Sequence, residues 1–267
     1  MSPSDTTTGD RLRQVFAGRQ AELRRITAAM TRPDFAGVAL IGAEGVGKSR
    51  LQVEAAAIAD PATYRVIHAA TTPATAAVPF GALAEHLPSG LLSLPFNGIA
   101  LRVAGDALRK LAGKRRLVLV ADDAHLLDEA SAALALQLAR RGELFILTTV
   151  RRGRRLPRPI ADLWTGGLAE WIEVGPLTRD DVEEMLIRSL PGQVEGLLVQ
   201  RCWEMTAGNA LLLRELVTAQ LAAGRLAERD GMWRLTGSFA IPSWLVSLVD
   251  ERLAASPPEC RPALELL

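Results

Sequence analysis

Short apolar runs alternate with longer amphipathic stretches through the first two thirds of the chain. The runs at 38–41 and 117–121 are continuously apolar, which is typical of parallel strands that are covered on both faces. With the weaker runs included, we expect strands over residues 38–41, 64–68, 117–121, 144–150 and 171–174. Strands that alternate with helices favour an α/β fold: a five-stranded parallel sheet, doubly wound, with helices on both faces.

The helices between these strands are predicted from apolar residues at helical spacing. We expect them over residues 20–30, 48–59, 80–113 with Pro and Gly breaks near 88–90 and 95–98, and 129–140. Asp128 stands directly before the last of these helices. We therefore interpret it as a helix cap and leave it out of the chemistry.

After Gly175 the pattern contains helices alone, so we expect a second domain there. Thr178 with Asp181 forms a capping pattern, and Asp230-Gly231 is the strongest hairpin signal in the chain. Helices are expected over 178–190, 194–206 and 210–223, a β-hairpin over 225–236, and a Pro-broken helix over 241–267. The expected organisation is a flexible leader 1–12, an α/β domain 13–174, a small helical domain 175–240 with its hairpin, and the start of a further, winged-helix-like module at 241–267. Because the last helix has no capping signal, we expect a fragment of a longer protein.

The charge balance limits the possible partners. The chain has 31 basic and 30 acidic residues, a formal net charge of +1. It lacks the excess of positive charge that is typical of a dedicated nucleic-acid binder. We therefore expect DNA contact only through a domain that this chain does not contain. Cys202 and Cys260 match no metal-ligand spacing, which favours a reduced, cytoplasmic setting. No apolar run is long enough to span a bilayer, so we expect no membrane partner.

The segment from Gly42 to Ser49 satisfies every fixed position of the phosphate-binding loop G-x-x-x-x-G-K-[ST]. It lies between an expected strand and an expected helix, as this loop requires. Backbone N–H groups of such a loop cradle nucleotide phosphates, its lysine reaches the outer phosphates, and its hydroxyl binds Mg²⁺. We therefore expect a nucleoside triphosphate and Mg²⁺ as cofactors, with Lys48 also catalytic. The expected nucleotide contacts in the loop are Gly42, Gly45, Val46, Gly47, Lys48, Ser49 and Arg50.

Two carboxylates, Asp122 and Asp123, directly follow the apolar run at 117–121. Open α/β sheets bind ligands at the carboxyl ends of their strands, so Asp122 is placed to hold Mg²⁺ with Ser49. Asp123 is placed to orient or deprotonate the attacking water. A helix cap or a solvated turn is the alternative for these aspartates. Nearby His125 either touches the outer phosphate or packs.

The strand expected at 144–150 is followed by Arg151 and Arg152. A cation at this end of the sheet can sense the terminal phosphate, and we assign that catalytic role to Arg151; solvated surface charge is the alternative. His68, at another strand end, is expected to be a satisfied histidine at the sheet margin. The later arginines are expected in a surface loop: Arg154, Arg155 and Arg158.

In this order and spacing, the motifs resemble the signal-transducing NTPases with numerous domains (the STAND class), and particularly the ATPase module of large ATP-binding LuxR-type transcriptional regulators. The resemblance covers nearly the whole chain from about Val15. It rests on segments 16–23, 42–51, 122–125, 149–151, 175–177 and 208–211 and on the hairpin with Trp233. It implies an AAA-like P-loop NTPase fold in which Gly18 and Arg19 lie against the adenine and the helical domain is a lid over the nucleotide.

One position departs from the pattern of that class. Its members usually have Gly-x-Pro-Leu, with the proline against the base or sugar, where this chain has Ala210 in the segment 208–211. Alanine cannot fix its backbone φ as proline does. The replacement therefore bears on how tightly the lid holds the nucleotide, and not on the fold.

The resemblance implies a signalling switch with slow ATP hydrolysis, the regulatory ATPase of a LuxR-type transcriptional regulator. An ADP-bound, closed monomer would exchange to an ATP-bound form that self-associates. The sensor and DNA-binding parts would lie beyond residue 267. Two alternatives stay open: the same module in a kinase- or cyclase-linked signalling protein, and a non-hydrolysing scaffold that keeps ADP bound.

Overall fold

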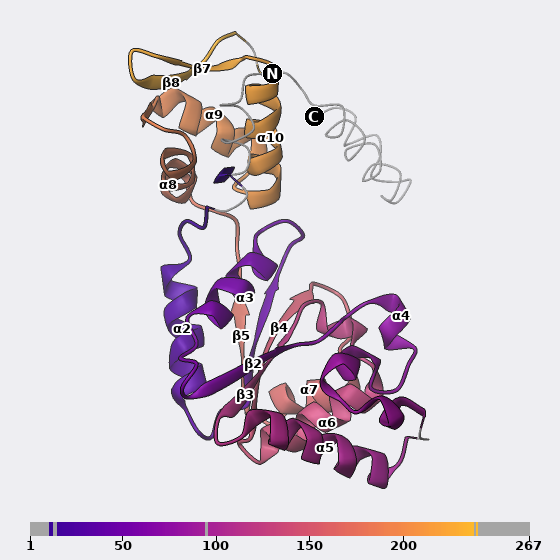
Figure 1. Ribbon diagram of the computed structural model, residues 1–267. Coiled ribbons are helices and arrows are strands. Elements are labelled where there is room, and N and C mark those ends of the chain that lie inside the picture. Colours follow the sequence, from indigo (N-terminus) through magenta and orange to yellow (C-terminus); the bar gives the residue numbers. More distant parts are fainter. Residues whose placement is uncertain (1–10, 13–14, 94–95, 238, 240–267) are drawn as a thin grey trace. The chain divides into compact units, whose positions relative to one another are not determined.

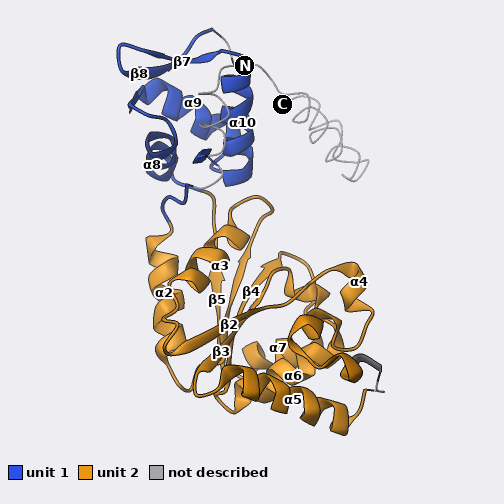
Figure 2. Ribbon diagram, viewed as in Figure 1, with its two compact units in different colours: residues 1–18, 177–267 blue, residues 19–176 orange. Residues whose placement is uncertain are grey.

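The computed structural model describes residues 11–12, 15–93, 96–237 and 239 (Figure 1). It divides into two compact units, residues 19–176 and residues 1–18 with 177–267 (Figure 2). The expected helix over 241–267 and most of the expected leader lie outside the described residues. Within the described ranges, no helix combines the length and the apolarity that crossing a membrane would need.

The unit of residues 19–176 is built on a five-stranded sheet, with strand order β2-β3-β4-β1-β5. Each pair of neighbouring strands is parallel. The strands are β1 (Gly37–Gly42), β2 (Tyr64–His68), β3 (Arg116–Ala121), β4 (Leu144–Arg151) and β5 (Ala169–Glu173). The predicted parallel sheet is confirmed, with the expected strands in place.

Helices cover both faces of this sheet (Figure 1). Leu119 and Ile146 belong to an apolar cluster that α5, α6 and α7 share with one face. The intervening residues of the same strands, such as Val118 and Leu147, are also buried. Side chains alternate between the faces of a strand, so these continuously apolar strands require cover on both faces. The helices of this unit are α2 (Gln20–Thr31), α3 (Lys48–Ala57), α4 (Pro73–Ala76), α5 (Gly98–Ala112), α6 (Glu129–Arg140), α7 (Arg158–Thr165) and the 3₁₀ turns η1 (Gly81–His86), η2 (Ser89–Ser93) and η3 (Ala124–Leu126).

Two helices lie outside the ranges where helices were expected. The short α4 follows Thr72, whose hydroxyl accepts from Thr75 N–H in a capping box. The other, α7, begins at Arg158 with proline in its first turn, a position where the missing N–H has no helical partner. Arg158 is exposed, as expected, but it opens a helix. The Gly and Pro signals were therefore interpreted too broadly as loop.

Among its described residues, the second unit contains the helices α8 (Arg179–Ser189), α9 (Gly196–Thr206) and α10 (Ala210–Ala222). Thr178 and Asp181 form the predicted capping box at α8. The predicted hairpin is β7 (Leu226–Arg229) with β8 (Met232–Leu235), and Asp230 and Gly231 both have positive φ at its turn. A further strand, β6 (Gln193–Val194), pairs parallel with β8. Two residues carry no readable periodicity, so this strand was missed.

The segment just before residue 19 also packs into the helical unit. Leu12 and Ala17 lie in its apolar cluster, the Gly18 N–H donates to Glu184, and Arg188 donates to the Phe16 carbonyl at 2.7 Å. We had placed residues 13–18 with the α/β domain. The difference arises because the apolar partners of this segment come from helices far along the chain, which no local pattern shows.

Candidate functional site

The loop between β1 and α3 has a backbone that only its glycines allow. Gly45 and Gly47 have φ of 79° and 99°, a region that L side chains rarely adopt. A Cβ on Gly42 would collide with the carbonyl oxygen of Val174. Because α3 begins at Lys48, the free N–H groups of its first turn lie at this loop, and helix N-termini of this kind attract anions.

The Lys48 side chain is buried against the loop. Its Nζ donates to the Gly42 carbonyl at 3.0 Å and to the Ala43 carbonyl at 2.7 Å. Burial lowers the pKa of Lys48 below its ordinary value, and nearby Asp123 opposes that shift. The ammonium therefore lies at the cradle, held by carbonyl oxygens that a phosphate oxygen can replace as hydrogen-bond acceptors.

The hydroxyl of Ser49 meets the carboxylate of Asp122, the two residues that we expect to hold Mg²⁺. Ser49 Oγ donates to Asp122 Oδ1 at 2.9 Å. Hydroxyl and carboxylate oxygens are the hard ligands that Mg²⁺ prefers, so this pair fits the metal. Among the described residues there is no group of three or more His, Cys, Asp or Glu that could hold a metal ion. Mg²⁺ would therefore complete its shell with phosphate oxygens and water, as it commonly does.

Thr149 positions both aspartates. This residue is 1% exposed at the end of β4. Its Oγ1 donates to Asp122 Oδ1 at 2.5 Å and accepts from the Asp123 N–H at 2.8 Å. In the structure its hydroxyl is committed to the two acidic residues.

Gln52 fixes the helix that follows the loop, and sequence reasoning missed it. It is 2% exposed on α3, and its Nε2 donates to the carbonyls of Ala121 and Leu147 at 3.1 and 2.8 Å. These carbonyls belong to the end of β3 and the middle of β4. A polar residue on the buried face of a predicted helix was the available signal, because such a group needs partners.

Asp123 and Arg151 form a forked ion pair. Arg151 Nε lies 3.1 Å from both carboxylate oxygens of Asp123, and its Nη2 lies 3.0 Å from Oδ2. The hydrogen bond to Asp123 raises the pKa of Arg151. Glu44 in the loop lies 3.7 Å from Arg151 Nη1. The structure thus brings the expected catalytic groups together, with Arg151 bound to Asp123.

The histidines near the strand ends have separate environments. His125 Nδ1 lies 4.0 Å from Asp123 Oδ1 and has no hydrogen-bond partner within the described part of the chain. The His68 carbonyl pairs with Nε2 of His86 at 2.9 Å. His68 therefore takes part in the sheet margin through its backbone.

Asp128 caps α6, as expected, and does more. It is 3% exposed, and its carboxylate accepts from the N–H groups of Ser131 at 2.9 Å, Phe80 at 2.8 Å and Ala82 at 3.0 Å. Asp128 thus connects α6 to residues 80–82, the segment where η1 begins.

The remaining predicted contacts lie in different places. Arg50 pairs with Glu54 on the same helix at 2.6 Å. Arg19 has a side chain 9% exposed and donates to the carbonyls of Val46 at 3.2 Å and Gly175 at 2.6 Å. Gly18 and Ala210 belong to the helical unit, where Ala210 starts α10 after its cap Asn209. Their nucleotide contacts remain predictions.

No protein-family model matches this sequence, and a search of curated proteins also gave no match. Solved structures do resemble it. Orc1 of Aeropyrum pernix, in complex with DNA, has a TM-score of 0.53 at 16% identity, over 94% of this chain and 71% of that one. Cdc6p of Pyrobaculum aerophilum has a TM-score of 0.55 at 14% identity, over 80% of this chain and 65% of that one.

A third structure connects the fold to signalling proteins. It is a signal transduction ATPase with numerous domains (STAND) from Pyrococcus horikoshii, with a tetratricopeptide repeat sensor. Its TM-score is 0.50 at 15% identity, over 92% of this chain and 33% of that one. At these identities the likeness shows the fold alone, which is that of a P-loop NTPase.

Proposed function

We propose that this chain is an ATP- and ADP-binding switch that hydrolyses ATP slowly. The observation that carries the proposal is the contact between Ser49 and Asp122, which joins the phosphate-binding loop to the strand end that follows the apolar run of β3. A glycine-rich turn that matched the motif by chance would have no reason to meet a carboxylate there. With Lys48 at the same loop, the groups for phosphate and for Mg²⁺ lie together.

Each group has a role that follows from its chemistry. The loop N–H groups and Lys48 bind the phosphates. Ser49 and Asp122 hold Mg²⁺, which neutralises phosphate charge when bound. Asp123 orients the attacking water, and Arg151 contacts the terminal phosphate. Thr149 keeps the two aspartates in place through its two hydrogen bonds.

We further propose that the switch serves a cytoplasmic LuxR-type transcriptional regulator. The motif order supports it, and so does the fold shared with a STAND protein. Self-association of the ATP-bound form, with the helical unit as a lid, would then expose an output region. DNA would be contacted only through a domain outside this chain.

Calorimetric titration with ATP and with ADP in Mg²⁺ tests the nucleotide site. We expect both to bind, and Lys48→Ala to weaken binding about 100-fold, because it removes the charged partner of the phosphates. Lys114→Ala is the matched control, since Lys114 is exposed on the turn before β3, at the opposite end of the sheet from the loop. Equal binding by wild type and Lys48→Ala would show that the loop is not the site.

Phosphate release separates a switch that resets from a permanent ADP scaffold. We expect wild type to release phosphate over several turnovers, slowly but faster than Lys48→Ala. A rate no higher than that of Lys48→Ala would favour the scaffold.

A further inference from the structure

The forked pair of Asp123 and Arg151 occupies the groups that the proposed reaction needs. Asp123 is the carboxylate placed for water, and Arg151 is the cation placed for the terminal phosphate, yet each is the other's partner. A planar guanidinium matches a carboxylate and a phosphate by the same forked geometry. Arg151 presents its Nε–Nη2 edge to Asp123, so a phosphate takes that edge only by displacing the carboxylate.

We propose that Asp123 competes with the terminal phosphate of ATP for Arg151, and that this exchange makes the site discriminate ATP from ADP. The inference rests on the proposed function and adds a competitor for the phosphate sensor. ADP has no terminal phosphate that would displace Asp123, so it binds with the pair intact. ATP binds with Arg151 transferred, and the carboxylate of Asp123 is released to accept a hydrogen bond from water.

The exposure of the pair makes the exchange feasible. The side chains of Arg151 and Asp123 are 46% and 21% exposed, so solvent screens their attraction and weakens the pair. Glu44, 3.7 Å from the guanidinium and 70% exposed, is a second, weaker competitor. A terminal phosphate carries more negative charge than either carboxylate and is the stronger partner for Arg151.

The charges around the pair also favour the transfer of Arg151 to a terminal phosphate. Asp122, Asp123 and Glu44 all interact electrostatically with Arg151 and with Lys48. Three carboxylates thus lie around Arg151 and Lys48. Mg²⁺ held by Asp122 would offset the charge of that carboxylate. As long as Asp123 holds Arg151, however, the guanidinium does not join Lys48 and the loop N–H groups as a partner for a third phosphate.

A neighbouring pair provides the control. Arg152 Nη2 is ion-paired with Glu173 at the end of β5, and both side chains are about two thirds exposed, at 67% and 68%. It has the same charges at the next position of the strand end but, within the described residues, no hydrogen bond or ion pair with Asp122 or Asp123. Neutralising it changes the net charge equally without freeing Arg151.

The experiment is a double-mutant cycle in Mg²⁺, read by calorimetric affinity for ADP and for the β,γ-imido analogue of ATP. We expect Asp123→Asn to raise the affinity ratio of triphosphate to diphosphate about tenfold and Arg151→Gln to lower it about tenfold, the size of one charge-assisted contact. The increase in this ratio that Asp123→Asn causes must disappear when the chain also carries Arg151→Gln. Glu173→Gln and Arg152→Gln should leave the ratio within about twofold.

Folding defects are separable from the effect. Asp123 has φ 49° and ψ 58°, a conformation that asparagine adopts as readily as aspartate. The urea midpoint of Asp123→Asn should therefore stay close to that of wild type.

Two results would overturn the inference. A gain that persists without Arg151 would mean that Asp123 only repels phosphate, and an unchanged ratio in Asp123→Asn would mean that the pair does not compete. Both leave the proposed function standing. Failure of wild type to bind either nucleotide would instead overturn the proposed function, and this inference with it.

Discussion

The two ends of the five-stranded sheet both carry arginines, but their partners differ. At the carboxyl end, Arg151 binds the side chain of Asp123 beside the loop. At the amino end, Arg116 donates to three backbone carbonyls, those of Met30 at 3.2 Å, Arg32 at 3.1 Å and Phe35 at 2.5 Å. Those carbonyls belong to the last turn of α2 and to the connection from α2 to β1, and no ligand competes with them for Arg116. A cluster of cations therefore does not by itself identify a binding site. The informative feature is whether the cations are held by side chains near a ligand loop or by backbone carbonyls.

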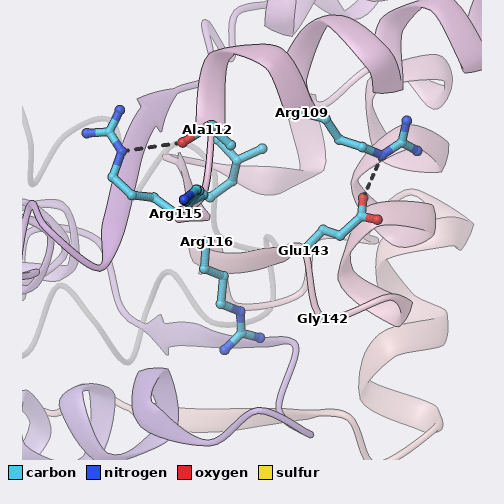
Figure 3. A pocket seen from close by; sticks show the side chains of 9 residues that line it. Arg109, Ala112, Arg115, Arg116, Gly142 and Glu143 are labelled. Carbon is cyan, nitrogen blue, oxygen red and sulfur yellow. Dashed lines mark hydrogen bonds and ion pairs between the residues drawn. The ribbon is translucent and has the colours of Figure 1, made fainter.

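The amino end also contains a pocket of about 340 Å³. Figure 3 shows Arg115 and Arg116 pointing away from each other at its rim, while Arg109 reaches Glu143. The lining residues are Arg109, Ala112, Gly113, Lys114, Arg115, Arg116, Leu117, Gly142 and Glu143. Arg109 and Arg116 donate their hydrogen bonds to groups of the protein itself. We therefore assign the pocket a structural role.

The strongest test of this comparison is Arg116→Met. Methionine keeps much of the side-chain volume but removes one donor from each of three carbonyls. The carbonyls of Met30 and Arg32 keep other donors, Tyr64 Oη at 3.0 Å and the Phe35 N–H at 3.3 Å, so we expect a loss of about 2 kcal/mol in the free energy of unfolding. Nucleotide affinity should be unchanged. Urea unfolding and calorimetric titration measure the two quantities.

Arg115→Met is the matched control at the neighbouring position. Arg115 reaches the carbonyls of Ala112 and Pro61 only at 3.4 and 3.5 Å. We therefore expect its loss to cost less than about 0.5 kcal/mol. Equal costs for the two variants would refute the view that Arg116 is held by its carbonyl partners.

This difference between arginines also marks what the sequence could predict. Continuous apolar runs predicted the strands, because burial on both faces leaves a local signal. The strand order, with β1 between β4 and β5, was not predicted, since pairing joins residues far apart in the chain. The partners of Arg116 come from a connection more than eighty residues earlier, and no spacing rule reaches that far.

A second test concerns the carboxyl end alone. Thr149→Val preserves shape but removes the hydroxyl that bonds both aspartates. We expect the ATPase rate to fall about tenfold, equivalent to about 1.4 kcal/mol in the barrier, because the two carboxylates lose their fixed geometry. The Mg²⁺ concentration for half-maximal rate should rise, which a purely structural loss would not cause.

The adjacent Thr148→Val is the control for that variant. Thr148 is fully buried on the same strand, and its hydroxyl donates to the Ala121 carbonyl at 2.6 Å. This change should cost about 1 kcal/mol of stability and leave the Mg²⁺ dependence unaltered. A shift of the Mg²⁺ dependence in both variants would show that Thr149 has no special role.

The candidate site was predictable in part, for a physical reason. Asp122 follows a buried strand directly, and Ser49 belongs to a loop of fixed geometry, so their meeting could be predicted from strand ends that share one edge. Gln52 and Thr149 act through hydrogen bonds across the sheet, which sequence spacing does not encode. The pairing of Arg151 with Asp123 was missed because each was assigned to a ligand.

The smallest expected effect is that of Arg109, at the amino end of the sheet. Arg109 resembles Arg151 in having carboxylate partners, Glu143 at 3.0 Å and Asp106 at 2.5 Å, but it lies beside no phosphate loop. Arg109 and Glu143 are both about one third exposed, at 34% and 33%, so Arg109→Gln should cost only about 0.5 kcal/mol at low salt. Because salt screens exposed pairs, that cost should vanish in 1 M NaCl, whereas the cost of Arg116→Met should persist. Nucleotide binding should not change in either variant. A salt-independent loss above about 2 kcal/mol for Arg109→Gln, measured by urea unfolding, would show that side-chain partners at this end are as fixed as the carbonyls of Arg116.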